Sequence, residues 1–192
     1  MNVYEYLPVF ESTNFKLRGV CYEDADDLLK VYSDKKAVPF FNGDNCHGDN
    51  FYYTTKERMQ EAIKFWLWSY DNGYFVRWAI IDKKINSAIG SIELFHRDDE
   101  VAEYDNCGLL RLDLRSDYEK ESAIKEILSM IEQPTYDLFG DKIVTKVKAF
   151  ATERHAAVKA LGFSLPQEPL RGQNGEEFND YYLKTRGDNS ER

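Results

Sequence analysis

The pattern of hydrophobic positions in the first half of the chain changes between a period of two residues, typical of strands, and a period of about 3.6, typical of helices. It predicts a strand at 15–20, a helix at 23–33, a helix at 54–71, and strands at 75–82 and 85–95. Thr54 and Glu57 match a capping box, in which each side chain satisfies a backbone donor at the start of the second helix. A polar turn at Lys83 and Lys84 joins the two later strands as an antiparallel pair.

The second half of the chain shows the same change of period. It predicts a strand at 110–114, a helix that starts after Asp117, a strand at 142–150, a helix at 152–161 and a last strand at 178–185. Pro134 is expected to break or kink the central helix because proline has no backbone N–H. Thr152 is expected to cap the short helix that Gly162 ends. Asn174-Gly175 predicts a turn ahead of the last strand.

The composition fits one α/β domain. With 192 residues, 43% hydrophobic and 31% charged, the chain is long enough to bury a core and short enough for a single domain spanning residues 1–192, with 187–192 as a frayed tail. No apolar run approaches the roughly 20 residues that span a bilayer, and the first residues do not resemble a secretion signal. We therefore expect a cytoplasmic protein without a membrane partner.

The cysteines and histidines offer little chemistry of their own. Cys21, Cys46 and Cys107 form an odd set without the spacing of metal ligands, which suits a reducing cytosol. Cys46 and His47 are adjacent, like a nucleophile and its base, but neighbours in a loop rarely hold catalytic geometry without a third orienting group. A zinc site formed by Cys46, His47 and Cys107 lacks the usual spacings. We expect no metal site.

The charge balance limits the partners. A formal net charge of −9 and an isoelectric point near 4.9 argue against a nucleic-acid partner, because binding phosphates requires clustered Lys and Arg. An acidic chain mildly favours a cationic substrate, although acidity also serves solubility alone. The segment 34–53 combines turn residues with a cluster of aromatic residues. A loop of about 20 residues inside a compact domain is usually functional or mobile.

Six segments in register carry a family resemblance. They are Phe15-Lys16-Leu17-Arg18 followed by Glu23-Asp24-Ala25, Arg77-Trp78-Ala79-Ile80-Ile81, Ile89-Gly90-Ser91-Ile92-Glu93-Leu94-Phe95, Ala160-Leu161-Gly162-Phe163, and Asn174-Gly175 leading into Asp180-Tyr181-Tyr182. With the predicted order β-α-α-β-β-β-α-β-α-β, the chain resembles the GNAT superfamily of N-acetyltransferases, and in particular the ribosomal-protein N-terminal acetyltransferases. The resemblance implies an α/β GNAT fold, with a mixed central sheet of about six to seven strands flanked by about four helices.

The resemblance also implies an activity. GNAT enzymes transfer an acetyl group from acetyl-CoA, their cosubstrate, to a primary amine; here the acceptor would be an N-terminal amine, a small amine or a polycation. In the family, the fourth strand pairs with the pantetheine arm, and the N-terminus of the central helix binds the pyrophosphate. The residues at the matching positions are Leu110, Leu112, Leu114, Lys120, Glu121, Ser122, Ala123 and Thr152.

Two departures from the family pattern bear on that activity. Relatives carry Gln/Arg-x-x-Gly-x-Gly/Ala where this chain has residues 117–122, so both usual glycines are missing. Glu119 and Glu121 place negative charge at the pyrophosphate position, although acids also suit a helix N-terminus. Val158 stands where some relatives carry a tyrosine as general acid. The alternative is a GNAT-fold protein that has lost efficient use of acetyl-CoA and serves as a binding module.

Acetyl transfer needs a general base near the amine nitrogen. The candidates, in order of preference, are Glu103, Asp105 and Glu93. The resemblance supports the first two, because relatives often carry an acid where the fourth strand begins.

The acceptor is expected at the aromatic loop, because aromatic faces attract organic ammonium groups. The residues expected to bind it are Phe40, Phe41, Tyr52 and Tyr53. Alternatively, the same side chains pack inward and anchor the loop. The sequence leaves a monomer and a homodimer equally open.

Overall fold

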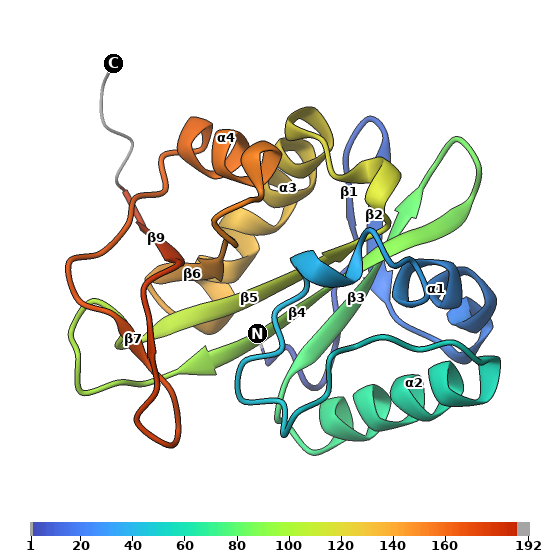
Figure 1. The fold of residues 1–192 in the computed structure, drawn as a ribbon, viewed down its shortest axis with the longest axis horizontal. Coiled ribbons are helices and arrows are strands. Elements are labelled where there is room, and N and C mark those ends of the chain that lie inside the picture. Colours follow the sequence, from blue (N-terminus) through green and yellow to red (C-terminus); the bar gives the residue numbers. More distant parts are fainter. Residues whose placement is uncertain (1, 188–192) are drawn as a thin grey trace.

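A seven-stranded mixed sheet runs through the molecule and carries helices on both faces (Figure 1). The computed structural model describes residues 2–187. The strands are β1 (Phe10–Glu11), β2 (Phe15–Gly19), β3 (Val76–Asp82), β4 (Ser87–Arg97), β5 (Cys107–Leu114), β6 (Lys142–Lys146), β7 (Leu170–Arg171), β8 (Glu177–Phe178) and β9 (Tyr181–Thr185). The helices are α1 (Ala25–Tyr32), α2 (Lys56–Asp71), α3 (Glu121–Phe139) and α4 (Thr152–Ala160), with short 3-10 turns η1 (Tyr22–Asp24), η2 (Val38–Phe40) and η3 (Ser116–Tyr118).

The strand order is β1-β2-β3-β4-β5-β6-β9, and β7 and β8 form a separate hairpin. Every neighbouring pair in the large sheet is antiparallel except β5 and β6. Parallel neighbours need a crossover connection, and α3 supplies it. The expected mixed sheet of six to seven strands with four helices is confirmed.

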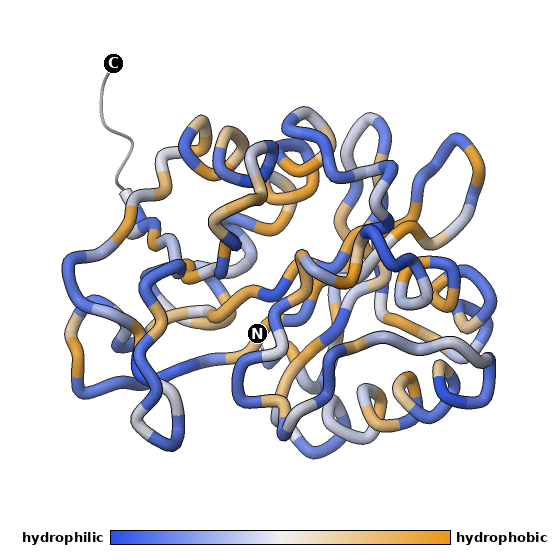
Figure 2. The backbone as a smooth tube through the Cα atoms, in the orientation of Figure 1, coloured by the Kyte–Doolittle hydropathy of each residue, from blue (hydrophilic) through white to orange (hydrophobic). Residues whose placement is uncertain are grey.

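Strand β3 shows why both faces of the sheet are covered. Its side chains alternate: Trp78 and Ile80 pack into the core beneath α3 and α4, whereas Ala79 and Ile81 pack beneath α1 and α2. All four are buried. Hydrophobic and hydrophilic residues alternate in bands along α2 (Figure 2), as expected of a helix that lies on a sheet with one face in water.

The sheet opens between β5 and β6. These strands pair from Cys107 and Lys142 as far as Leu110 and Thr145, and the rest of β5, residues 111–114, pairs only with β4. The first turn of α3 and the helix α4 lie over this divergence, because Ile124 and Val158 pack in one core with Leu112. The opening and its surroundings are therefore a candidate for a binding site.

Several predicted boundaries differ from the observed ones. Thr55, not Thr54, caps α2: its side chain accepts the backbone N–H of Arg58 at 3.2 Å, so the predicted capping box is wrong by one residue. The expected break at Pro134 does not occur, and α3 continues to Phe139. The Thr135 hydroxyl donates a hydrogen bond to the carbonyl oxygen of Ile131 at 2.7 Å. This bond lies next to Pro134, which has no backbone N–H to donate.

The C-terminal part also differs in detail. Ala151, not Thr152, occupies the N-cap of α4. Its side chain is buried in the core, an environment that favours an apolar residue over a polar one. The predicted strand at 178–185 is divided: β8 pairs with β7 across the Asn174-Gly175 turn, and β9 begins at Tyr181. Apart from Gly187, the expected tail lies outside the described residues.

Candidate functional site

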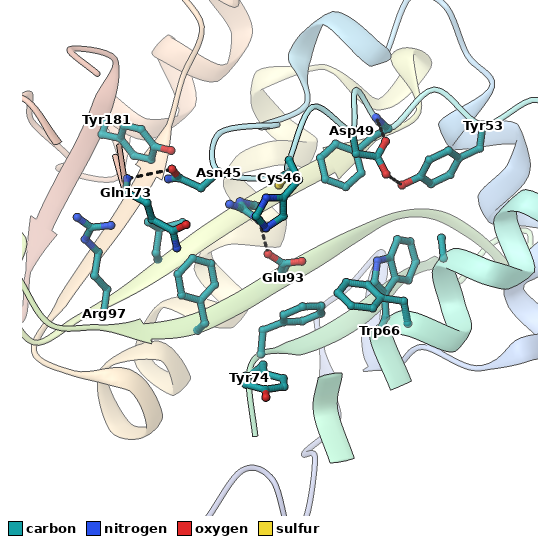
Figure 3. Close-up of a pocket in the computed structure, with 18 of the residues that line it drawn as sticks. Asn45, Cys46, Asp49, Tyr53, Trp66, Tyr74, Glu93, Arg97, Gln173 and Tyr181 are labelled. Atoms are coloured by element: carbon teal, nitrogen blue, oxygen red, sulfur yellow. Dashed lines mark hydrogen bonds and ion pairs between the residues drawn. The ribbon is translucent and has the colours of Figure 1, made fainter. Parts of the chain in front are cut away.

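A cavity of about 560 Å³ lies beneath the segment 42–53, which leads from α1 toward α2 (Figure 3). We call it the aromatic pocket. Its aromatic lining consists of Phe51, Tyr53, Phe65, Trp66, Tyr74, Phe75, Phe95 and Tyr181. Its charged and amide lining consists of Asn45, Asp49, Arg58, Glu93, Arg97, Arg111 and Gln173, with Cys46 and His47 from the covering loop. This size and mostly apolar lining are typical of small-molecule sites.

The covering loop has an unusual backbone. Asn45, His47 and Phe51 adopt positive φ angles of 59°, 53° and 58°, a conformation that costs a non-glycine residue of the order of 1–3 kcal/mol and persists where surrounding contacts impose it. One such contact joins the loop to the β7–β8 hairpin, where the Asn45 side-chain oxygen accepts the backbone N–H of Gln173 at 3.2 Å (Figure 3). The loop is therefore held in a defined shape over the pocket.

Asp49 fixes the other end of this loop. Its carboxylate accepts the backbone N–H of Phe51 at 2.8 Å, the hydroxyl of Tyr53 at 3.0 Å and Nη2 of Arg58 at 2.8 Å. The Arg58 guanidinium also lies over the Tyr53 ring, 4.2 Å from its centroid. Burial and the nearby Asp49 charge raise the pKa of Tyr53, so this hydroxyl stays protonated at neutral pH and donates to Asp49.

Glu93 forms the charged floor of the pocket. One carboxylate oxygen accepts Nη1 of Arg111 at 2.7 Å, and the other pairs with Arg77. Arg77 in turn donates to the hydroxyl of Tyr32 at 3.0 Å and to Asp113 at 3.2 Å. Burial raises the pKa of Glu93, but the two guanidinium charges outweigh it, and the net effect lowers that pKa. With both oxygens engaged, Glu93 is poorly suited to accept a proton from a substrate.

The other two predicted bases do not line the pocket. Glu103 accepts the backbone N–H groups of Gln167 at 3.3 Å and Glu168 at 3.1 Å. Asp105 accepts the backbone N–H of Asp99 at 3.1 Å. Both carboxylates therefore serve to order nearby chain segments.

The four predicted acceptor-binding aromatics separate into different environments. Tyr53 lines the pocket; Phe41 is buried and packs on Tyr32, with ring centroids 5.2 Å apart. Phe40 lies on the far side of the loop against Phe150, and Tyr52 is half-buried outside the pocket lining. The alternative role, anchoring the loop, therefore describes Phe41.

The other aromatic residues of the walls were not identified from the sequence, because they lie in or beside regular elements and not in the loop. Phe65 and Trp66 belong to α2, and Tyr74 and Phe75 immediately precede β3. Of the two α2 tryptophans, Trp66 is buried and Trp68 is exposed, because residues two apart lie on different faces of a helix. One signal was available in the sequence. Phe65 and Trp66 are adjacent aromatic residues on a helix that buries only one face.

A groove on the opposite face of the sheet, between the diverging ends of β5 and β6 and the helices α3 and α4, is almost filled. It leaves only about 10 Å³, lined by Leu112, Ile124, Leu128, Thr145, Lys146, Val147, Arg154 and Val158. The largest occupant is Arg154 of α4, which donates Nε to Glu119 at 2.9 Å and a second hydrogen bond through Nη2. Both side chains are about 5% exposed.

The N-terminus of α3 is also occupied by the chain itself. Glu153 of α4 accepts the backbone N–H of Glu121 at 2.7 Å. Unpaired N–H groups at a helix N-terminus attract anions, and here a carboxylate already fills that role. Lys120, Ser122 and Thr152 are exposed around this end, with no side-chain hydrogen bond to another residue of 2–187.

A second ion pair separates the groove from the aromatic pocket. Lys146, at the end of β6, pairs with Asp44 of the covering loop and lies 3.4 Å from Asp180. The hydroxyl of Tyr181 donates to Asp44 at 3.1 Å. Because Lys146 lines the groove and Tyr181 lines the pocket, this cluster fills the opening between the two.

The sequence matches the family described as Acetyltransferase (GNAT) domain over residues 14–164. The chain belongs to the GNAT family. The matched range includes both faces of the sheet, the groove and most of the aromatic pocket. No curated protein sequence matches this GNAT chain significantly.

Solved structures share the GNAT fold at low identity. RimL, a ribosomal L7/L12 alpha-N-protein acetyltransferase in complex with coenzyme A, is 14% identical, with 93% of this chain and 98% of that chain covered and a TM-score of 0.67. The ribosomal-protein-S5-alanine acetyltransferase from Vibrio fischeri is 16% identical, with 94% and 98% covered and a TM-score of 0.62. The microcin C7 self-immunity acetyltransferase MccE, in complex with acetyl-CoA and AMP, is 13% identical, with 91% and 93% covered and a TM-score of 0.67. RimL thus binds coenzyme A and MccE binds acetyl-CoA, consistent with the expected acetyl-CoA cosubstrate.

The residues of this chain fit only part of a CoA molecule. The portion of β5 that lacks a β6 partner, residues 111–114, is where the family resemblance places the pantetheine arm. The diphosphate end does not fit this arrangement, because the Glu153 carboxylate accepts a backbone N–H at the N-terminus of α3, and Arg154, held by Glu119, lines the nearly filled groove. The one signal of this in the sequence is the pair of charged residues Glu153 and Arg154 in the last helix.

Other site types have little support in the residues described. Within 2–187, no group of three or more His, Cys, Asp and Glu side chains is arranged to hold a metal ion. No helix in that range is long and apolar enough to cross a membrane.

Proposed function

We propose that this GNAT-family chain binds a small molecule in the aromatic pocket and does so without efficient use of acetyl-CoA. The observation that carries the proposal is the internal occupation of the groove, where Arg154, Glu119 and Glu153 take the positions that a diphosphate would need. The pocket on the other face of the sheet is open, with a volume of about 560 Å³.

The energetic argument rests on the buried ion pair. Separating two buried partners costs about 3–5 kcal/mol, and micromolar binding supplies only about 8 kcal/mol in total. Displacing Arg154 from Glu119 would therefore lower the affinity for a CoA compound by roughly a hundredfold to several thousandfold, since each 1.4 kcal/mol is a factor of ten. The new anion would also meet the carboxylates of Glu119 and Glu153 at close range.

A second candidate is the family activity itself, transfer of an acetyl group from acetyl-CoA to a primary amine. The specific observation in its favour is the edge of β5 that lacks a β6 partner, together with the CoA compounds held by RimL and MccE. Its acceptor would be an N-terminal amine, a small amine or a polycation in the aromatic pocket. The observation against it is that neither oxygen of Glu93, the one predicted base in the pocket, is free.

Either function would be carried out in the cytoplasm, by a monomer or a homodimer. The cysteines support this compartment, because Cys21, Cys46 and Cys107 are all free thiols in the described structure.

Isothermal titration calorimetry with acetyl-CoA tests the proposal. We expect no binding by the unmodified protein at 1 mM acetyl-CoA. One-site micromolar binding would contradict the proposal and favour the acetyltransferase. Acetyl-CoA carries an aromatic base and phosphates, so it could also bind in the aromatic pocket. Any heat of binding is therefore measured again in Arg58→Gln, which changes only that pocket. A signal that is lost in this variant comes from the pocket and not from the groove.

Two further variants test whether the ion pairs close the groove. Glu153→Ala removes the carboxylate from the N-terminus of α3, and the double variant E119S/R154S empties the groove while removing both charges together. We expect the double variant to bind acetyl-CoA at least tenfold more tightly than the unmodified protein. The control is Arg186→Gln, which breaks an exposed ion pair with Asp137 far from the groove residues.

A further inference from the structure

We propose that the occupant of the aromatic pocket is a planar aromatic molecule that carries an anionic group, a carboxylate or a phosphate. This inference rests on the proposed function, because it names the ligand class of the same pocket. It differs from the expectation drawn from the overall charge, which favoured a cation. The argument comes from three properties of the lining: its flat walls, its remaining donors and its fully engaged acids.

The walls of the pocket include aromatic rings that are partly exposed. Phe65 and Tyr74 are 55% and 61% exposed, although both also line the cavity. Phe65 contacts Phe75 edge-on, with centroids 6.0 Å apart, and the buried Trp66 lies in the same wall. Exposed aromatic faces beside a cavity offer stacking area to another ring, at separations of about 4.5–7 Å between centroids. A planar aromatic ligand uses this area best.

Guanidinium groups supply the cationic arginine donors that remain in the pocket. Arg58 uses only Nη2, in its bond to Asp49, so Nε and Nη1 have no hydrogen-bond partner among residues 2–187. Its side chain is 41% exposed and therefore reachable. Arg111 uses Nη1 and Nη2, and its Nε, which has no partner within the described chain, is buried, so of these two arginines Arg58 offers the reachable donors. Guanidinium donors bind carboxylates and phosphates more strongly than neutral acceptors.

The acids of the pocket offer little to a cation. Both oxygens of Glu93 already face guanidinium groups, of Arg77 and Arg111, and Asp49 accepts three hydrogen bonds. An ammonium ligand would have to compete with these arginines for each carboxylate, and it would meet their positive charge on approach. Arg97 also lines the pocket, and its charge is paired with that of Asp99, which does not line the pocket. An anion can instead bind Nε and Nη1 of Arg58, which the bond to Asp49 leaves without a partner in the described chain.

Matched pairs of probes test the proposal by calorimetry, without acetyl-CoA. Indole-3-acetate and tryptamine share one ring and differ in the sign of their charge, and AMP and adenosine differ by the phosphate. We expect a dissociation constant below about 1 mM for at least one anion, at least tenfold tighter binding than its partner probe, and a loss of about tenfold in Arg58→Gln. The two anions distinguish a carboxylate ligand from a phosphate ligand.

Further variants separate the walls from general effects. Phe65→Ala is expected to weaken both members of a pair, because it removes a stacking surface and leaves Arg58 in place. The controls are Tyr22→Ala, an exposed ring outside the pocket, and Arg186→Gln, an exposed arginine elsewhere. Tighter binding of tryptamine, no binding of any probe at 10 mM, or unchanged anion binding in Arg58→Gln would each overturn the proposal. Acetyl-CoA binding in the groove would overturn the proposed function and leave this result intact.

Discussion

Glu93 shows how a single position changes its meaning once the strands are paired. The register places Arg77 of β3 and Arg111 of β5 directly across from Glu93 of β4, so three charged residues form a row across neighbouring strands. All three lie in the interior or nearly so, with side-chain exposures of 1%, 12% and 4% for Arg77, Arg111 and Glu93. The carboxylate is thus a structural partner for two guanidinium groups beneath the pocket.

We predict that Glu93→Gln lowers the free energy of unfolding by about 3–5 kcal/mol, because removal of this charge leaves the largely buried Arg111 without a counter-ion and leaves Arg77 with Asp113 alone. Urea denaturation at pH 7 measures the change. Glu100→Gln, at an exposed carboxylate, is the control and should stay within about 0.5 kcal/mol of the unmodified protein. A loss below 1 kcal/mol in Glu93→Gln would contradict the buried arrangement.

At the scale of single residues, the sequence predicted which residues lie near the site better than it predicted what each of them does. Glu93 was identified as an acid near the site, and it does line the pocket. Its pairing was not predictable, because Arg77 and Arg111 are distant in the chain and the register that aligns them depends on two hairpin-like connections. Arg58 was not identified at all, since its role depends on a loop that folds back onto α2.

At the scale of elements, period and turn chemistry predicted most helices and strands, and the errors lie at their ends. Thr54 and Thr55 both satisfy the rule for a helix cap, and the choice between them depends on which residue the chain turns at. Pro134 was expected to interrupt α3, but tertiary packing of Ile131 and Tyr136 on either side holds the helix together. The pair Arg154–Glu119 joins α4 to the turn before α3, a contact that no local pattern reveals.

We predict that Thr55→Ala lowers stability by about 1 kcal/mol, because α2 loses the side-chain acceptor of the Arg58 N–H. The neighbouring Thr54→Ala is the matched control, since Thr54 is exposed and caps nothing in the structure. Thermal and urea unfolding of the two variants side by side measure the difference. A larger effect at Thr54 would restore the capping box that the sequence favoured.

At the scale of the whole molecule, acid should destabilise the fold. Glu126 of α3 accepts hydrogen bonds from the backbone and side chain of Asn14 and from Ser12, at 2.7–2.8 Å. Burial raises the pKa of Glu126, but these hydrogen bonds outweigh it and lower the pKa below its usual 4.5. The pKa of Asp34 and that of Asp99 are lowered from 3.8 in the same way, by bonds that outweigh burial.

A lowered pKa stabilises the fold above the pKa of the unfolded chain, and this contribution disappears as pH falls through the folded value. We therefore predict a falling melting temperature as pH drops below about 4.5. Glu126→Gln should be about 1–2 kcal/mol less stable at pH 7, and the difference should shrink as pH falls through the lowered pKa of Glu126. Calorimetric scans from pH 7 to 3 measure both, with Glu100→Gln as the control. A difference that does not shrink over this range would mean that the Glu126 charge is not its cause.

The filled groove has a consequence for the life of the protein in a cell. A ligand that binds only the native state adds to stability in proportion to the logarithm of its concentration, so proteins with open cofactor sites are protected when that cofactor is plentiful. Under the proposed function, the ion pairs of Arg154 with Glu119 and of Lys146 with Asp44 supply from within the chain contacts that a cofactor would otherwise bring. The turnover of this protein should therefore be independent of the metabolic supply of CoA thioesters, in starved and in well-fed cells alike.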